Sequence, residues 1–222
     1  KPKNLEQIKI PSIDLKLGEE SSLDEIETII KNSKRKMLWV GNGCKFAREE
    51  VKKFINMGFA IVTSTLGRGV ISESNNMSLG AFNAVPLIEE FYKTVDLMIV
   101  AGSRLRGHET RDMSLKLPDN IIQIDIDPKA KNRTYKTKKF HCGDAQKVLD
   151  ELSNRLSNQL TLDKEWENEI SQLKNKILED YKSNLGAYKD FPEIVRKVLP
   201  ENGMWVRDVT ISNSMWGNRS MF

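Results

Sequence analysis

The segment Met37–Cys44, which reads MLWVGNGC, decides the fold class of this chain. Its four apolar residues are followed at once by the glycine break Gly41-Asn42-Gly43, and a helical pattern then runs from Phe46 to Met57. A short, continuous apolar run bounded by glycine is typical of a strand that is buried on both faces. The segment therefore predicts a buried strand that turns directly into a helix.

The same unit recurs along the chain. Further apolar runs occur at Phe59–Val62, Val95–Ala101, Asn120–Ile126 and Lys139–Cys142. Helices are expected at Leu23–Asn32 behind a Ser22–Glu25 capping box, at Pro86–Lys93, and at Ala145–Leu156 behind the N-cap Asp144. Buried strands that alternate with helices predict an α/β fold, a doubly wound, mostly parallel Rossmann-like sheet with a helical appendage.

Composition divides the chain into four parts. Residues 1–20 hold two prolines and read as a linker or leader, and residues 21–157 carry the sheet pattern. Residues 158–189 read as a linker helix, for which partner binding is the alternative. Residues 190–222 begin a second unit, with a helix at Phe191–Leu199 and a strand at Met204–Arg207, and we expect it to be truncated.

Charge and cysteine content argue against several classes of function. The 35 basic and 31 acidic residues are scattered, so we expect no nucleic-acid partner, and the lysine-rich segment 129–139 reads as a solvated loop. Cys44 and Cys142 form no CxxC pair, which argues against a zinc site and fits free thiols in the cytoplasm. No apolar run approaches the roughly 20 residues of a membrane span, so no membrane partner is expected.

In doubly wound sheets, ligands bind beyond the carboxyl ends of the strands, where the strand order reverses. Gly41 and Gly43 lie in such a turn, where glycine lets a diphosphate approach the backbone at a helix N-terminus. A tight turn without a ligand explains them equally well. The third glycine of GxGxxG is missing, and Thr63 and Ser64 stand where a ribose-binding acid is expected, so an ordinary NAD dehydrogenase is disfavoured.

Two further strand ends carry candidate ligand-binding residues. Gly102 and Arg104 follow one strand, and this arginine could hold a phosphate or carboxylate, although an ion pair with Glu109, Asp112 or Asp127 is favoured. Asp125 and Asp127 end the next strand and could bind a ribose or adenine, or could cap the turn at Pro128.

Arg106 and Arg111 carry the same two alternatives as Arg104. His108 and His141 are expected to be structural, and no catalytic residue is identified.

Six segments together resemble the middle domain of thiamine-diphosphate enzymes such as acetolactate synthase and benzoylformate decarboxylase. They cover about residues 36–152 in the family's order: Trp39–Cys44, Ile61–Ile71, Leu79-Gly80, Asp96–Arg104, Ile122–Pro128 and Cys142–Leu149.

The tail Trp205–Arg219 resembles the opening of the family's C-terminal, diphosphate-binding domain. The resemblance places Asp208, Ser212, Asn213 and Ser214 at the edge of the thiamine diphosphate site of the full protein. On the residues alone, a polar turn is the alternative.

The resemblance also implies parts that residues 1–222 do not contain. The family's catalytic glutamate lies in an N-terminal domain, and its Gly-Asp-Gly…Asn magnesium motif lies further into the C-terminal domain. Thiamine diphosphate and magnesium are therefore expected in the full-length protein, and neither a cofactor nor catalysis in this chain alone. The full protein would be a transferase or lyase that decarboxylates or ligates 2-keto acids or similar small molecules, as a homodimer or homotetramer.

Family members differ in the ligand of the middle domain, which is FAD in acetolactate synthases, ADP in oxalyl-CoA decarboxylase and absent in many decarboxylases. The loop Arg104–Arg111 departs from the FAD pattern, so we expect an empty or degenerate nucleotide site. A stand-alone nucleotide- or flavin-binding module is the alternative function, and an interaction protein that uses the 158–189 helix is a third.

Overall fold

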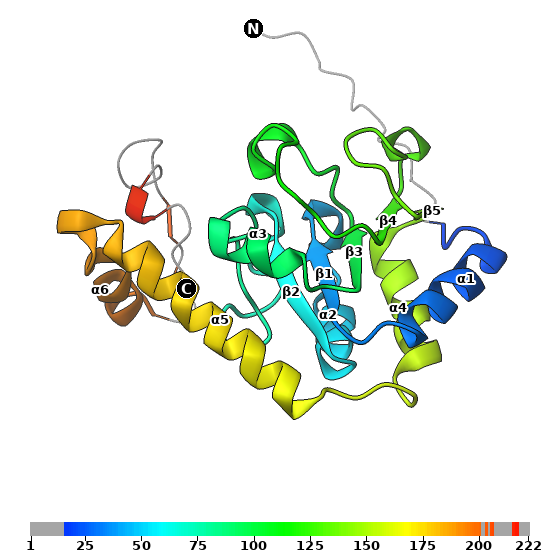
Figure 1. Cartoon of the computed structure of the whole chain (residues 1–222), viewed down its shortest axis with the longest axis horizontal. Coiled ribbons are helices and arrows are strands. Elements are labelled where there is room, and N and C mark those ends of the chain that lie inside the picture. The colour runs from blue at the N-terminus through cyan, green and yellow to red at the C-terminus, as the bar shows by residue number, and fades with distance from the viewer. Residues whose placement is uncertain (1–15, 201–202, 204, 207–214, 218–222) are drawn as a thin grey trace, which may run out of the picture.

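The computed structural model describes residues 16–200, 203, 205–206 and 215–217 (Figure 1). Its sheet has five strands in the order β2-β1-β3-β4-β5, and every neighbouring pair is parallel. The strands are β1 (Lys36–Val40), β2 (Phe59–Thr63), β3 (Leu97–Ala101), β4 (Ile121–Asp125) and β5 (Lys139–Cys142). The predicted doubly wound α/β sheet is confirmed, and it is parallel throughout.

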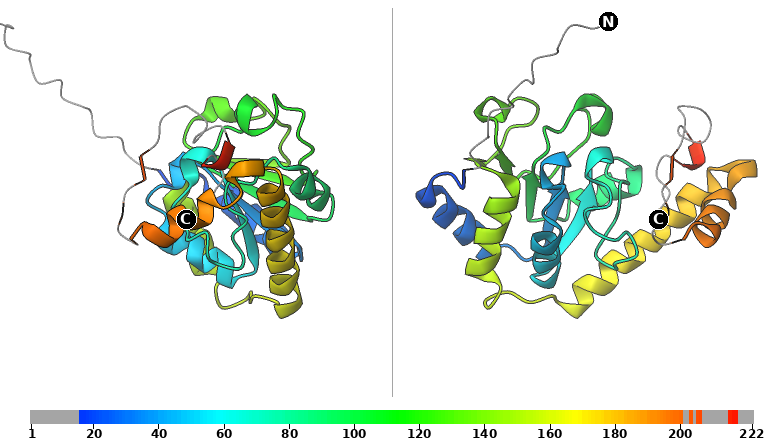
Figure 2. Two further views of the ribbon diagram at one scale, coloured as in Figure 1. Left: turned by 90° about the vertical axis from the view of Figure 1, so that its left-hand side faces the viewer. Right: turned by 180° about the vertical axis from the view of Figure 1, so that it is seen from behind.

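Burial on both faces explains the continuous apolar runs. Every residue of β1, β2, β3 and β4 is buried, whereas the edge strand β5 is only partly covered. Three helices pack together on one side, α1 (Glu20–Lys31), α2 (Arg48–Asn56) and α4 (Ala145–Leu156), while α3 (Pro86–Tyr92) contacts α5 (Lys164–Ser183) on the other (Figure 2). The sheet is thus the middle of three layers.

The chain path creates a switch point in the sheet. From β1 the chain moves outward to β2, and it then returns past β1 to form β3. The turns that leave β1 and β3 therefore diverge at the carboxyl edge, which is where such sheets bind ligands. Four 3-10 turns shape this edge: η1 (Asn42–Cys44), η2 (Thr65–Gly67), η3 (Gly107–Glu109) and η4 (Pro128–Ala130).

The predicted capping box at the start of α1 is wrong. The helix begins at Glu20, its N-cap Glu19 makes no side-chain cap, and Ser22 lies buried inside the helix. The reason is tertiary, because the preceding segment is docked on β5. The Nε2 atom of His141 lies 2.6 Å from the carbonyl oxygen of Leu17, and its Nδ1 atom lies 3.1 Å from Ser22 Oγ. The structural role predicted for His141 follows from these contacts.

The N-cap predicted for α4 is confirmed, since the Asp144 carboxylate accepts a hydrogen bond from the backbone amide of Lys147 at 3.1 Å. Helix α4 occupies the predicted range Ala145–Leu156. Local sequence was sufficient here because both the cap and the apolar face lie within the helix and its neighbours.

The helix predicted within residues 158–189 is α5, followed by the short turn η5 (Gly186–Tyr188) and by α6 (Phe191–Val198). Trp166 anchors α5 to the sheet domain: its Nε1 atom donates to the carbonyl oxygen of Gly58 at 3.0 Å, and its ring stacks on Phe91.

Within the predicted strand Met204–Arg207, Trp205 and Val206 lie outside any strand, and its two end residues are not among those that the structure describes. None of the described helices combines the length and apolar character that crossing a membrane requires.

Candidate functional site at the switch point

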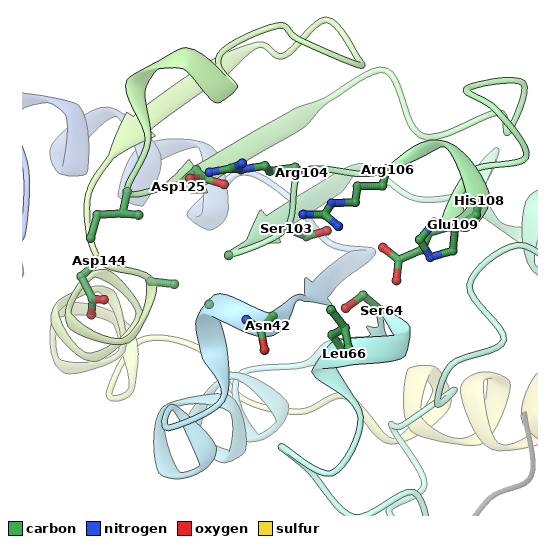
Figure 3. Close-up of a pocket in the computed structure, with 14 residues that line it drawn as sticks. Asn42, Ser64, Leu66, Ser103, Arg104, Arg106, His108, Glu109, Asp125 and Asp144 are labelled. Carbon is green, nitrogen blue, oxygen red and sulfur yellow. The ribbon is translucent and has the colours of Figure 1, made fainter. Parts of the chain in front are cut away.

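A cavity of about 360 Å³ opens at the switch point (Figure 3). Its walls come from the turns after β1, β2, β3 and β4 and from the first residues of α4. The lining residues are Asn42, Gly43, Ser64, Leu66, Gly102, Ser103, Arg104, Arg106, His108, Glu109, Asp125, Ile126, Asp144 and Ala145. Of the residues singled out from the sequence, those that line the cavity are Gly43, Gly102, Arg104, Arg106, His108 and Asp125, whereas Gly41 and Asp127 do not line it.

The three glycines bring two backbone turns into contact. The amide of Gly41 donates to the carbonyl of Ala101 at 2.9 Å, and the amide of Gly43 donates to the carbonyl of Gly102 at 3.0 Å. A Cβ atom on Gly41 would collide with the carbonyl oxygen of Gly102, and one on Gly43 would lie 2.7 Å from the Gly102 Cα atom. Close packing of the turns therefore accounts for these glycines without a ligand.

Arg104 and the two aspartates bond to one another and to their own turn. The Arg104 guanidinium lies 3.1 Å from Asp127 Oδ2, and Asp127 Oδ1 accepts from the amide of Lys129 at 2.9 Å. Asp125 Oδ1 accepts from the amide of Asp127 at 2.9 Å. The geometry matches the structural alternatives for these residues, an ion pair for Arg104 and a capped turn at Pro128.

Arg111 lies outside the cavity and forms an ion pair with Glu89. The Glu89 carboxylate also accepts from the amide of Lys116 at 2.7 Å. This backbone hydrogen bond and the arginine together lower the pKa of Glu89. The pair ties the loop after β3 to helix α3, so Arg111 stabilises the loop and does not face the cavity.

Ser64 lies in the loop Thr63–Leu66, which the strand-end rule selects, whereas sequence reasoning considered Glu109 only as an ion-pair partner of Arg104; both residues line the cavity. Glu109 is 7% exposed, and its Oε1 atom accepts from the amide of Thr65 at 2.8 Å. Ser64 Oγ accepts from the amide of Gly67 at 3.0 Å. Only burial in the fold distinguishes Glu109 from the charged residues around it, and no spacing signal could have revealed it.

The electrostatic character of the cavity is mixed. Three carboxylates line it, from Glu109, Asp125 and Asp144, against the guanidinium groups of Arg104 and Arg106. Figure 3 shows the Arg106 side chain reaching over the cavity toward Ser103. A diphosphate placed against the glycine turns would meet more acidic than basic side chains, and one of the two arginines is already paired with Asp127. These residues do not fit a tightly held diphosphate.

The residues expected at the edge of the thiamine diphosphate site, Asp208, Ser212, Asn213 and Ser214, lie outside the described residues. His108 lines the cavity and is exposed, with no catalytic partner arrangement around it among the described residues. Within the described part of the chain, no group of three or more metal-binding side chains gathers at one place.

Comparison with known proteins agrees with this architecture. A tobacco (Nicotiana tabacum) chloroplastic acetolactate synthase 2 is 26% identical over 214 residues, which are 90% of this chain and 32% of the relative. A chloroplastic acetolactate synthase of Arabidopsis thaliana is 28% identical over 191 residues, 82% of this chain and 28% of the relative. A probable acetolactate synthase large subunit of Methanococcus aeolicus is 25% identical over 209 residues, 89% of this chain and 35% of the relative.

This chain therefore spans about a third of the length of these relatives. The family model described as the central domain of thiamine pyrophosphate enzymes matches residues 23–152, which contain the whole sheet, helices α2 and α3, and most of α1 and α4. The chain belongs to the thiamine pyrophosphate enzyme family, and these residues form its central domain.

Proposed function

We propose that this chain serves as the structural centre of a thiamine-diphosphate-dependent enzyme and does not catalyse the parent reaction alone. The observation that carries the proposal is the match of residues 23–152 to the central domain of that family. The switch-point cavity supports it, because its glycines pack backbone against backbone and Arg104 and Asp127 neutralise each other. Such a domain contributes rigidity and correct spacing to the domains on either side of it.

For the parent protein we propose decarboxylation or carbon–carbon ligation of a 2-keto acid or a similar small molecule. The relatives are named acetolactate synthases, which makes a transferase or lyase of this kind the best-supported choice. Thiamine diphosphate, with magnesium, would supply the carbanion chemistry when bound. We further propose a homo-oligomeric protein in the cytoplasm, although the plant relatives are named chloroplastic.

Residues 190–222 are proposed to begin the diphosphate-binding domain. Helix α6 at Phe191–Val198 supports this assignment because it buries none of its residues against the central domain. Hydroxyl and amide groups such as those of Ser212, Asn213 and Ser214 are suitable donors to phosphate oxygens. In this proposal they would border the thiamine diphosphate together with Asp208.

A turnover assay tests the inactivity of the chain. The purified 222-residue chain would be incubated with pyruvate, thiamine diphosphate and magnesium, and carbon dioxide release and acetolactate formation would be followed. We expect no turnover above the rate without protein, with circular dichroism as the control that the chain is folded. Turnover that scales with protein concentration would overturn the proposal.

The absorption spectrum tests the alternative, a flavin-binding module. The mixed charge of the switch-point cavity predicts that the purified chain is colourless. When a flavin nucleotide is added and the mixture is passed through a desalting column, we expect the flavin to separate from the protein. A yellow preparation whose flavin co-elutes with the chain would favour the alternative.

A further inference from the structure

The loop between β4 and β5 carries a dense positive charge. Residues 129–139 contain six lysine or arginine residues and no acidic residue. One of the six, Lys139, pairs with Glu25 of α1. The other five are exposed: Lys129, Lys131, Arg133, Lys136 and Lys138. We call this segment the basic loop, and Figure 1 shows part of it standing above the carboxyl edge of the sheet.

The backbone of the basic loop is held in place by side-chain hydrogen bonds. Asn132 Oδ1 accepts from both the amide and the hydroxyl of Thr137, at 2.9 and 3.1 Å. The Tyr135 hydroxyl donates to the carbonyl oxygen of Leu115 at 3.0 Å. The first of these contacts brings residues 131–133 next to residues 136–138. Four of the exposed cations are therefore carried by two short stretches that lie side by side.

The charges of the basic loop are not balanced by carboxylates, unlike those of several other exposed cations. Lys52, Lys93 and Lys164 each bond to a glutamate three residues away, at 2.7 or 2.8 Å. In the part of the chain that the structure describes, no carboxylate forms an ion pair with the five exposed cations of the loop. Asp127, just before the loop, pairs with Arg104. An ordered surface of unbalanced positive charge attracts anionic partners.

The other side chains of the loop indicate which kind of anionic partner fits. Single-stranded nucleic acids bind proteins that offer exposed aromatic rings for base stacking. Tyr135 is the one aromatic residue in the segment, and it is half-buried with its hydroxyl bonded to Leu115. Binding to a lipid surface needs apolar side chains that can enter it, but Ala130 is 2% exposed. A protein partner requires neither feature.

We propose that the basic loop is a docking surface for an acidic, extended segment of a partner protein. The cations are spread along the loop, so they match a ligand with several separate negative charges. In an extended segment, carboxylates at alternate positions share one face and can meet such a row of cations. This inference goes beyond the proposed function, since it concerns neither the thiamine diphosphate site nor the switch-point cavity.

Fluorescence anisotropy with the 222-residue chain tests the proposal. The probe is a fluorescein-labelled peptide of alternating glutamate and glycine, titrated at low salt and at about 0.5 M salt, where screening should abolish binding. A variant that combines Lys131→Gln, Arg133→Gln and Lys136→Gln should bind the peptide about tenfold more weakly, because it loses three ion pairs with the ligand. All three side chains are exposed, and the thermal midpoint checks that the variant is folded.

The matched control combines Lys52→Gln, Lys93→Gln and Lys164→Gln. It removes the same net charge from lysines that already have carboxylate partners, so it should change the affinity less than twofold. Three outcomes would overturn the proposal. They are an absence of peptide binding at low salt, equal weakening by the control, and tighter binding of phosphatidylserine vesicles or of an oligouridylate with the same number of charges as the peptide.

Discussion

Helices α4 and α6 have similarly amphipathic sequences but opposite environments. Helix α4 buries an apolar stripe, Val148, Leu149, Leu152 and Leu156, against the sheet and its neighbours. Helix α6 buries none of its residues, and Ile194 and Val198 are 55% and 72% exposed. An amphipathic pattern therefore predicts a helix and its apolar face. It does not show whether the surface that covers this face belongs to the residues that the structure describes.

The largest expected difference in stability is between substitutions of a phenylalanine in the sheet domain and a phenylalanine in α6. Phe54 of α2 is fully buried and makes an edge contact with Phe59, whereas Phe191 of α6 is 42% exposed. Phe54→Ala should lower the free energy of unfolding by about 3–5 kcal/mol because it leaves a cavity in the core.

Phe191→Ala is the matched variant, and it should lower the free energy of unfolding by about 1 kcal/mol or less. Both values come from urea unfolding followed by circular dichroism. Similar losses from the two variants would show that α6 belongs to the same core as the sheet.

The second prediction concerns the attachment of α5. The Trp166 ring stacks on Phe91, and the Arg35 guanidinium lies 4.5 Å from the Trp166 ring centroid and 5.4 Å from that of Phe91. Arg35 also pairs with Glu169 at 2.7 Å. Trp166→Ala removes this contact and the hydrogen bond to Gly58, so it should lower the free energy of unfolding by about 3 kcal/mol.

Trp166→Phe keeps the stacking and loses only the hydrogen bond, for an expected cost of about 1 kcal/mol. Chemical denaturation of both variants gives the two values. If both variants matched the wild type, α5 would be held to the sheet domain by other contacts.

The third prediction is a pH effect at Lys174 on α5. This lysine is 9% exposed, and its Nζ atom donates to the carbonyls of Glu73 and Asn75 at 2.5 and 2.9 Å. Burial lowers the pKa of Lys174, so the folded chain holds its proton less tightly than the unfolded chain does. Stability should therefore rise with pH as the pH climbs through the lowered pKa toward the ordinary value of 10.5.

Lys174→Met provides the comparison, because it cannot gain this stability. The difference in unfolding free energy between the wild type and Lys174→Met should shift in favour of the wild type between neutral pH and pH about 10. Thermal or urea unfolding at several pH values measures it. A difference that stays constant over that range would contradict the lowered pKa.

The smallest effect is a difference in thiol reactivity within the sheet domain. Cys44 is buried, its thiol donates to the carbonyl of Ala101 at 3.3 Å, and burial raises its pKa to about 12. Cys142 is exposed. A disulfide reagent at pH 8 should modify one thiol per folded chain quickly and the second only after unfolding. Rapid modification of both would show that the turn after β1 opens readily.

The sequence was sufficient to predict the sheet because each strand is identified by its own residues. Runs such as MLWV at Met37–Val40 are apolar without alternation and end in glycine, and β1 to β4 are indeed buried throughout. The start of α1 was mispredicted because the contacts that fix it come from β5, over a hundred residues away.

The candidate site was predictable only in part, for a similar reason. Strand ends located Gly43, Gly102, Arg104 and Asp125 at the switch point. The ion pair of Arg104 with Asp127 and the burial of Glu109 beside these residues were not predictable. Both depend on contacts between loops that lie far apart in the sequence.

The central claim is that the sheet and helices α1 to α4 form one stable core to which α6 does not belong. Hydrogen exchange of the backbone amides, measured for each helix and strand, tests this claim most directly. We expect β1, β3 and α4 to exchange slowest, near the rate set by global unfolding, and α6 to exchange orders of magnitude faster. Equal protection of α6 and the strands would contradict it.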